Sequence, residues 1–309
     1  MANNIRNILV NRDALLGVIF ALLAAVGFSA KAILVKLAYL DSVDAMTLLA
    51  LRMAFSVPFF VGVALWARRQ HAEPLNQHDR MLVLGLGLIG YYLSSFLDFL
   101  GLQYISAGLE RLILFLYPTM TVILTALVYK RVIGRRTLAA MALCYAGIVL
   151  VFMHDMGTKQ GVSVVLGASL VFASTLSYSI YLVGAGHAIA RIGAARFTAY
   201  AMIVASAASL LQLGVTHPLS ALDLPLRVYE LAIAMAIFST VLPVFLLSYA
   251  IHRIGSGNAS LIGTIGPVST IYMAYVILGE SISLLQIVGS SLVLVGVLVI
   301  SASSKNVGK

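Results

Sequence analysis

Hydrophobic runs of about 20 residues recur along the whole 309-residue chain, and no other feature limits its possible folds as strongly. A helix of that length crosses a hydrocarbon core about 30 Å thick. The runs are continuous rather than alternating, so they do not predict the strands of a transmembrane barrel. The sequence therefore predicts an all-α integral membrane protein with little of the chain outside the bilayer.

The runs divide into ten predicted membrane spans with short connections. Their approximate bounds are 14–38, 45–66, 81–99, 105–128, 137–153, 162–185, 196–215, 230–251, 257–278 and 283–302. The first run has the basic start of a signal peptide, but it continues past Lys31 to Ala38. That is too long for a typical signal core, so the run is counted as the first span.

The distribution of Lys and Arg predicts the orientation of the spans, because membrane proteins retain these residues in their cytoplasmic loops. With the N-terminus inside, fourteen basic residues are cytoplasmic and two, Lys159 and Arg227, are external. The fourteen are Arg6, Arg12, Arg68, Arg69, Arg80, Lys130, Arg131, Arg135, Arg136, Arg191, Arg196, Arg253, Lys305 and Lys309. We therefore expect a multi-pass protein of the bacterial inner (plasma) membrane with both termini in the cytoplasm.

Several function classes find no support in the sequence. The net charge of +9 comes from short basic clusters between apolar runs, so it does not indicate nucleic-acid binding. The single cysteine, Cys144, cannot form an internal disulfide, and no Cys or His spacing predicts a metal or other cofactor. All six histidines (71, 78, 154, 187, 217 and 252) fall in or beside loops, and no DDxxD, HExxH or GxSxG motif is present. We expect no enzyme, and an intramembrane transferase is a remote alternative.

The chain also contains an internal repeat. Shifted by 149 residues, "GLQYISAGLERLILFLYP" (101–118) lies on "AIHRIGSGNASLIGTIGP" (250–267), and Pro118 meets Pro267. Continued without a gap, the same shift places Gly147 on Gly296.

This repeat predicts an architecture as well as a duplication. Each half, 14–153 and 162–302, holds five predicted spans. Five is an odd number, so the halves enter the membrane in opposite senses. Two inverted five-helix repeats around a central cavity are a recurring transporter design, with the substrate site near the midplane.

Three stretches carry a resemblance to a known family: "SAGLERLILFLYP", "TLLALRM" and "SGNASLIGTIGPVSTIYMAYVILGESISLLQIVGSSLVLVGVLVI". The whole chain resembles the ten-span exporters of the drug/metabolite transporter superfamily, built from two EamA-type repeats. Within it the chain looks most like the bacterial YddG-type amino-acid exporters. The first half departs from the pattern, because Tyr129, Lys130 and Arg131 replace the "LGE" that ends at Glu280. Any role of that Glu is therefore not symmetric.

Charges at membrane depth cost at least ~2.5 kcal/mol each, so each needs a reason. Lys36 is expected to extend to the outer headgroups, whereas Lys31, about one turn deeper, is a candidate for an aqueous cavity. For Arg52 we expect a structural pairing with Asp41 or Asp44, with substrate contact as the alternative.

The adjacent charges Glu110 and Arg111 point about 100° apart on a helix, so they cannot pair with each other. We expect Glu110, Arg111 and Asp98 to rim an outward vestibule. The expected partners of Glu110 and Arg111 are Asp98 and either Lys31 or Arg52. A structural clamp, a gate or substrate-attracting role, and proton coupling are open alternatives. Asp98 and Glu110 are the two plausible sites of protonation within the membrane. Because both are expected to be paired, we expect facilitated transport without an obligatory ion.

Polar and aromatic residues near mid-depth form the predicted substrate cavity, since aromatic walls with a few hydroxyls suit an apolar amino acid. The candidates are Phe28, Ser29, Lys31, Tyr91, Tyr92, Ser95, Phe96, Tyr178, Tyr181, Phe238 and Ser239. Ordinary helix packing is the alternative for each small polar residue. Three mid-span prolines, Pro118, Pro243 and Pro267, are candidate hinges, with static kinks as the alternative.

The resemblance implies an exporter of small amphipathic metabolites, with amino acids, including aromatic ones, as the expected substrates, working by alternating access between the repeats. Export and substrate come only from the resemblance. A multidrug or lipid-like metabolite carrier on the same scaffold is the main alternative. The expected partners are a small-molecule substrate and the lipid bilayer, and a monomer is expected because one chain supplies both halves of the site.

Overall fold

The computed structural model describes residues 12–70, 75–130, 132–158 and 161–304. Within these ranges the chain is helical and contains no strand, so the all-α prediction is confirmed. Several residues used for the orientation argument or the histidine count lie outside the described ranges: Arg6, His71, Arg131, Lys159, Lys305 and Lys309.

Some spans are single helices and others are interrupted. The uninterrupted helices are α2 (Arg12–Tyr39), α3 (Ala45–Gln70), α8 (Arg135–Thr158), α9 (Gly161–Ile192), α10 (Ala194–Thr216) and α14 (Leu284–Ser304). Four spans are interrupted. The first consists of α4 (Gln77–Gly87), the π-helix η1 (Leu88–Leu93) and α5 (Ser94–Leu102), and the second of α6 (Ala107–Leu114) and α7 (Tyr117–Tyr129). The third consists of α11 (Leu226–Ala236), the π-helix η3 (Ile237–Val241) and α12 (Leu242–Gly263) as far as Gly255, where a non-helical residue (φ 77°, ψ 155°) turns the chain. The fourth consists of the end of α12, α13 (Ile265–Met273) and the π-helix η4 (Ala274–Leu278). A short 3₁₀ helix, η2 (Leu219–Leu222), precedes α11.

Nine helical segments of the described chain are long and apolar enough to cross a membrane. They are Asp13–Tyr39, Ala45–Arg69, Gln77–Leu102, Ala107–Tyr129, Arg135–Gly157, Ser163–Gly186, Ala194–Thr216, Leu226–Gly255 and Leu261–Leu278. A further apolar helical stretch, Leu284–Ile300, is shorter. The protein is therefore a multi-pass membrane protein.

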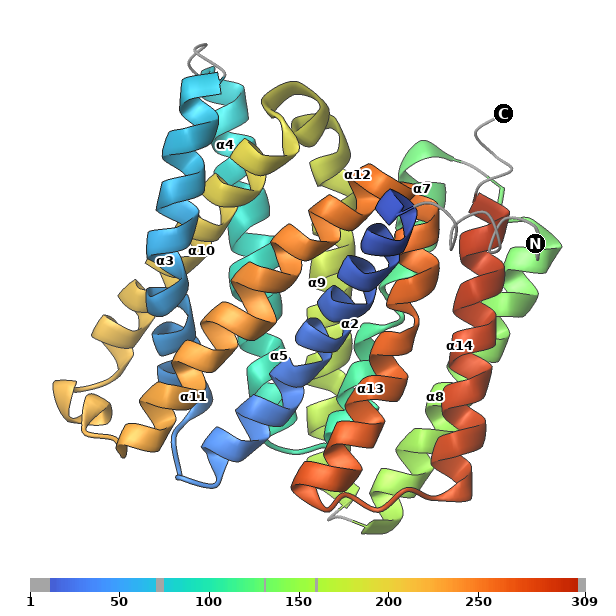
Figure 1. Cartoon of the computed structure of the whole chain (residues 1–309). Coiled ribbons are helices and arrows are strands. Elements are labelled where there is room, and N and C mark those ends of the chain that lie inside the picture. The colour runs from blue at the N-terminus through green and yellow to red at the C-terminus, as the bar shows by residue number, and fades with distance from the viewer. Residues whose placement is uncertain (1–11, 71–74, 131, 159–160, 305–309) are drawn as a thin grey trace.

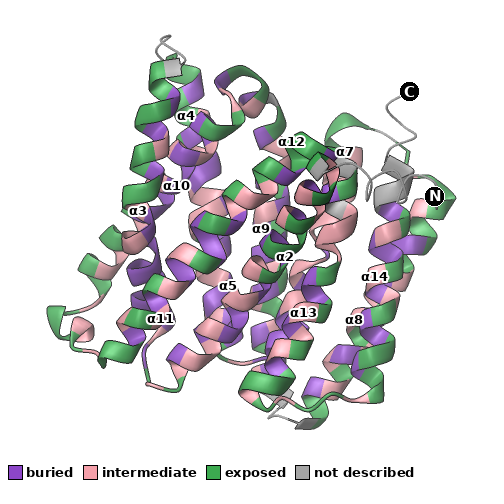
Figure 2. Ribbon diagram, viewed as in Figure 1, coloured by how far each residue is buried: buried purple, intermediate pink, exposed green. Residues whose placement is uncertain are grey.

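The helices stand side by side, with α8 and α14 at one edge and α3 and α10 at the other (Figure 1). Between these pairs, α2 packs along α12 and α5 packs along α9. Figure 2 shows exposed residues over much of the outer surface, and large apolar side chains such as Leu65 and Leu211 are 57% and 69% exposed there. In a membrane protein such a surface faces lipid, so it needs no polar cover.

Glycines set the closest approach of α8 and α14. A Cβ added at Gly147 would collide with the carbonyl oxygen of Gly289, and one at Gly296 would lie 2.7 Å from that of Ala140. Small residues let membrane helices pack backbone against backbone, and van der Waals contact then stabilises the pair. The two repeat-related glycines, Gly147 and Gly296, therefore have a packing role.

Four of the irregular segments recur in pairs at the spacing of the sequence repeat, whereas η4 has no counterpart in α7. The π-helices η1 and η3 begin at Leu88 and Ile237, which are 149 residues apart. The break between α6 and α7 includes Phe115, and the break between α12 and α13 falls at Thr264, again 149 residues later. The repeat is thus visible in the backbone as well as in the sequence.

Candidate functional site

A cavity of about 480 Å³ lies between the helices at the level of these breaks. The four irregular segments that recur in pairs contribute to its wall: Gly90 and Tyr91 from η1, Leu114, Phe115, Tyr117 and Pro118 at the α6–α7 break, Ser239 and Thr240 from η3, and Gly263 and Thr264 at the α12–α13 break. Non-helical backbone at membrane depth is tolerated where it is buried in protein or lines a cavity. The breaks therefore mark the wall of a site.

Proline accounts for three of the four interruptions. Pro118 and Pro267 have no N–H to donate to the carbonyls of Leu114 and Gly263, four residues earlier. Pro243, at the start of α12, likewise leaves the carbonyl of Ser239 without its helical donor. The three predicted hinge residues thus sit at or beside a break, while η1 contains no proline.

The N-terminus of α6 is fixed by side chains. The Oγ of Ser106 accepts from the N–H of Leu109 (3.0 Å), and Ser106 donates through N–H and Oγ to the carboxylate of Asp155 (2.8 and 2.9 Å). Glu280 Oε1 accepts from the N–H of Ala107 at 3.0 Å. Both acids also complement the positive end of the helix dipole. The Glu of the "LGE" motif therefore anchors a helix of the other half of the chain.

A charge cluster lies on α2, α5 and α6. Lys31 Nζ pairs with Asp98 Oδ2 and with Glu110 Oε1, the latter at 2.9 Å. Asp98 is 3% exposed and Glu110 is fully buried. Asp98 and Lys31 line the cavity, whereas Glu110 does not. The expected pairing of Glu110 with Lys31 is thus present, and the cluster ties three spans together. The expected ion pair of Arg111 with Asp98 is not formed, because Lys31 is the cation that pairs with Asp98.

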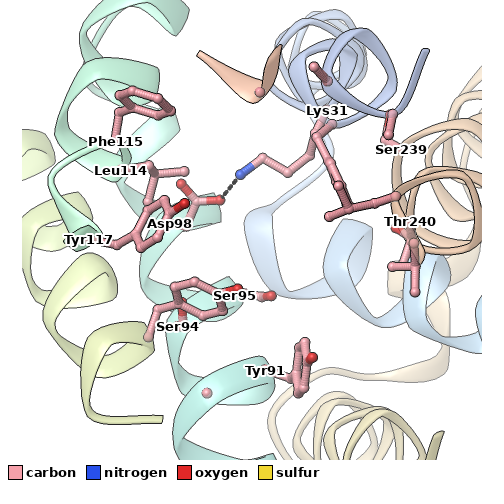
Figure 3. Close-up of a pocket in the computed structure, with 18 of the residues that line it drawn as sticks. Lys31, Tyr91, Ser94, Ser95, Asp98, Leu114, Phe115, Tyr117, Ser239 and Thr240 are labelled. Carbon is pink, nitrogen blue, oxygen red and sulfur yellow. Dashed lines mark hydrogen bonds and ion pairs between the residues drawn. The ribbon is translucent and has the colours of Figure 1, made fainter. Parts of the chain in front are cut away.

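Figure 3 shows how this cluster meets the rest of the wall. The side chain of Lys31 reaches towards Asp98, and Tyr91 lies at the other end of the view. Leu114, Phe115 and Tyr117 lie on one side, and Ser239 and Thr240 on the opposite side. Charged, aromatic and hydroxyl groups thus share one hollow.

The expected pairing of Arg52 with Asp41 or Asp44 is wrong. Arg52 donates to Ser95 Oγ at 3.1 Å, and its guanidinium lies 4.8 Å from the centroid of the Phe99 ring. Asp41 pairs with Arg227 (3.7 Å) and Asp44 with His217 (3.4 Å). The C-cap of α10 and the first turn of α11 therefore supply the partners of these acids, and Arg52 lines the cavity.

Tyrosines build one wall. The hydroxyls of Tyr91 and Tyr181 are 2.9 Å apart. The ring of Tyr178 lies 5.5 Å from that of Tyr181 and 5.9 Å from that of Tyr117, between ring centroids. Such ring pairs add roughly 0.5–1.5 kcal/mol beyond burial, so the tyrosines stabilise one another in this wall.

The structure brings many of the predicted site residues together at the cavity. Those in its wall are Phe28, Lys31, Tyr91, Ser95, Tyr178, Ser239, Asp98, Arg111 and Pro118.

Five predicted cavity residues lie outside that wall. Ser29 is buried and donates to the carbonyl of Gly266 at 2.8 Å. Tyr92 donates to Gln212, and Phe96 stacks on Tyr92. Tyr181 lies behind Tyr91, and Phe238 is 57% exposed.

Three predicted gate and hinge residues also lie outside it. Glu110 is buried beside Lys31, Pro243 packs against Gly27, and Pro267 is buried.

Other wall residues escaped the sequence analysis. Phe115, Tyr117 and Thr264 stand at the two breaks, one to three residues before Pro118 or Pro267. The matched prolines could have pointed to them, because the residues preceding a proline leave the regular helix. Arg52, for which substrate contact is the less favoured sequence-based alternative, also lines the wall.

The fold and the cavity together define a class of protein: a helical membrane protein with interrupted spans around an internal polar site. This is the arrangement of a membrane transporter. The chain belongs to the EamA-like transporter family, which matches residues 15–153 and 165–302.

Curated relatives agree with this assignment. The chain is 32% identical over 284 residues to the uncharacterized transporter YcbK of Bacillus subtilis (strain 168), covering 90% of each sequence. It is 25% identical over 302 residues to the uncharacterized transporter sll1319 of a Synechocystis species, covering 90% and 91%. A solved crystal structure matches with a TM-score of 0.64 at 17% identity, covering 95% of this chain and 99% of the other, and this likeness concerns the fold alone.

In the residues that the structure describes, no group of three or more His, Cys, Asp or Glu side chains could hold a metal ion.

Proposed function

We propose that the protein exports small amphipathic metabolites, amino acids and aromatic ones among them, by alternating access between two inverted five-helix repeats. The observation that carries the proposal is the convergence of four helix interruptions, spaced 149 residues apart in pairs, on one polar cavity. Broken helices at corresponding positions of two halves are the usual sign of a transporter site.

The ten-span topology has support beyond the sequence. The helix α14 has 21 residues, about 30 Å at 1.5 Å per residue, which suffices for a tenth span. In Figure 1, α2 and α9 run in opposite directions, as do α8 and α14. α2 packs on α12, and the equivalent helices of the other half, α9 and α5, pack on each other. The equivalent helices α3 and α10 also contact each other across the two halves, as do α8 and α14. These features favour two inverted repeats, over 14–153 and 162–302.

The proposed direction comes from the resemblance to exporters, and the extent of the cavity is compatible with it. With both termini in the cytoplasm, the charge cluster is near the outer end of α2, because Lys31 stands eight residues before Tyr39. The lining reaches towards the opposite end, to Thr198, the fifth residue of α10, and to Ile251. The cavity then faces the cytoplasm of a bacterial inner membrane, which is the side on which an exporter takes up its cargo.

The wall favours an amphipathic cargo. Pockets for small organic ligands occupy about 300–1,000 Å³, and this cavity falls in that range. Tyr91, Tyr117 and Tyr178 offer apolar rings with polar tips, while Lys31 and Asp98 offer charge. This combination supports an amino acid more than a purely apolar lipid.

A filled-cavity variant tests the proposal. Purified protein in proteoliposomes loaded with unlabelled phenylalanine or threonine is given the labelled amino acid, and counterflow is measured. Ser95→Trp, which fills the cavity, is expected to abolish counterflow, while Leu65→Trp on the lipid-facing surface retains it. Flux of a lipophilic dye without flux of any amino acid would favour the multidrug or lipid-like alternative.

Ion coupling can be tested on the same vesicles. Asp98 and Glu110 are already held by Lys31, so we propose facilitated transport without an obligatory proton. Counterflow and net flux are expected to be unchanged by an imposed pH gradient. Accumulation driven by the gradient, lost in Glu110→Gln, would overturn this part of the proposal.

A further inference from the structure

Two guanidinium groups in the cavity wall form no close ion pair with a carboxylate of the described residues. Arg52 and Arg111 both line the cavity, and Arg52 is only 6% exposed. No carboxylate in the described part of the chain lies within 4.0 Å of either group. The Nε atom of each is buried without a hydrogen-bond partner among the described residues. A buried guanidinium in this situation is costly unless another group neutralises it.

The local charges do not cancel. Lys31 is held by Asp98 and Glu110, which together carry one negative charge more than it does. Arg52 and Arg111 add two positive charges, so the five groups leave one positive charge in excess. At membrane depth an excess charge calls for a counter-ion, and the open space beside these groups is the cavity itself.

The two arginines are held in place by different elements. Arg52, on α3, donates to Ser95 on α5, one turn before Asp98, and covers the ring of Phe99. Arg111, on α6, lies against α13, where a Cβ on Gly266 would be 2.9 Å from its Nη2 atom. Gly266 thus leaves room for the guanidinium. The cations therefore reach the cavity from separate helices, with Asp98 within Coulombic reach of both.

The cavity is also polarised along its length. The five charged residues belong to the first half of the chain. The residues 149 positions later are Ile180, Ala201, Leu247, Ala259 and Ser260, all uncharged. Leu247 and Ala259 line the cavity, together with Ile251, away from the charge cluster. A ligand that fits has one anionic end and one apolar end.

We propose that Arg52 and Arg111 form a carboxylate-binding subsite, and that the cargo is a carboxylate-bearing metabolite rather than a lipophilic cation. Guanidinium groups bind carboxylates through paired N–H donors, and these charge-assisted bonds are about twice as strong as neutral ones. The apolar part of the cargo then lies against Leu247 and Ile251. This inference rests on the proposed function, because it takes the cavity to be the transport site.

A ligand series separates the charge of the cargo from its apolar part. Labelled phenylalanine counterflow is challenged with 3-phenylpropionate, which keeps the carboxylate, and with phenethylamine, which keeps only the cation. Phenylalanine methyl ester removes the carboxylate charge from the same skeleton. Competition by 3-phenylpropionate is expected within a few-fold of that by phenylalanine, and competition by the other two at least tenfold weaker. Equal competition by phenethylamine overturns the inference.

Variants then assign the subsite. Arg52→Gln and Arg111→Gln are each expected to weaken 3-phenylpropionate binding at least tenfold and to reduce its advantage over phenethylamine. Arg69→Gln, exposed near the end of the same helix as Arg52, is the matched control and should change neither value. Arg52→Lys keeps the charge but not the fork, so it should retain part of the preference and guards against a folding artefact. A uniform loss for every ligand, with the preference intact, contradicts the assignment.

Direct titration of the purified protein with 3-phenylpropionate distinguishes the two proposals. Arginine-dependent binding without any amino-acid flux would leave the subsite standing and sink the amino-acid proposal. Amino-acid flux that survives both Arg→Gln substitutions would support the amino-acid proposal and contradict the arginine subsite.

Discussion

Removing the Lys31 ammonium is the perturbation that most directly probes the charge cluster. In Lys31→Met the side chain keeps much of its apolar length but loses the cation that lies between Asp98 and Glu110. Two buried carboxylates are then left next to each other. The protein is expected to lose stability, because a buried charge without its partner keeps its desolvation cost and loses its compensation.

The size of the effect follows from the geometry. At 2.9 Å and an effective dielectric constant of about 20, one Lys31–Glu110 contact is worth about 6 kcal/mol before desolvation is subtracted. Breaking a buried pair by removing one partner costs about 3–5 kcal/mol. Arg52 and Arg111 are within Coulombic reach of Asp98 and partly replace the lysine, so the lower end, about 3 kcal/mol, is expected.

A double-mutant cycle measures this coupling. Lys31→Met, Glu110→Gln and the double variant are unfolded by SDS titration in mixed micelles, and their free energies of unfolding are compared. The double variant should cost less than the sum of the singles by roughly 0.5–3 kcal/mol, because Glu110→Gln removes one of the orphaned charges. Lys130→Met, on an exposed residue at the end of α7, should stay within about 0.5 kcal/mol. Additive singles, or a Lys31→Met cost below about 1 kcal/mol, would show that the cluster is not a clamp.

Three further substitutions test other parts of the fold. Gly147→Ala should destabilise the protein by roughly 1–3 kcal/mol, because its Cβ meets the facing backbone of α14. Gly62→Ala, whose Cβ would meet nothing within 4 Å, should be neutral or stabilising by up to about 1 kcal/mol. Equal thermal stabilities of the two variants would contradict this. Glu280→Ala removes the acceptor of the Ala107 N–H and should cost about 1 kcal/mol, measured by the same SDS titration, while no change would argue against the cap. Pro118→Ala restores an N–H donor and should straighten the span, lowering counterflow without lowering thermal stability; unchanged counterflow would make the kink static.

Hydropathy was sufficient to locate nine spans of the described chain, because a membrane helix must be apolar over its full length. The participation of Lys31, Asp98 and Glu110 in one cluster was also within reach, since charges at membrane depth need partners. The partner of Arg52 was wrongly predicted because the choice of partner depends on where the helix ends lie, and the first turn of α11 brings Arg227 to Asp41. Sequence gives no access to that arrangement.

The faces of the interrupted spans could not be predicted for a related reason. A π-helix adds a residue to one turn, so it rotates everything after it relative to a regular helix. The segment η1 contains no proline that would predict this rotation. In η3, Phe238 is exposed whereas Ser239 lines the cavity. Candidates chosen by regular helical spacing are therefore least reliable at the very segments that build the wall.

The confinement of the five membrane charges to one half of the chain has a consequence for how the two halves can be recombined. A symmetric pair made of two first halves would bring ten ionised groups into one enclosure, with two unmatched cations, and a pair of second halves would bring none of these five groups. Each half is thus specialised for the other, as in an obligate heterodimer encoded as a single polypeptide. Co-expression of the halves as separate fragments should restore flux, and doubling either fragment alone should not.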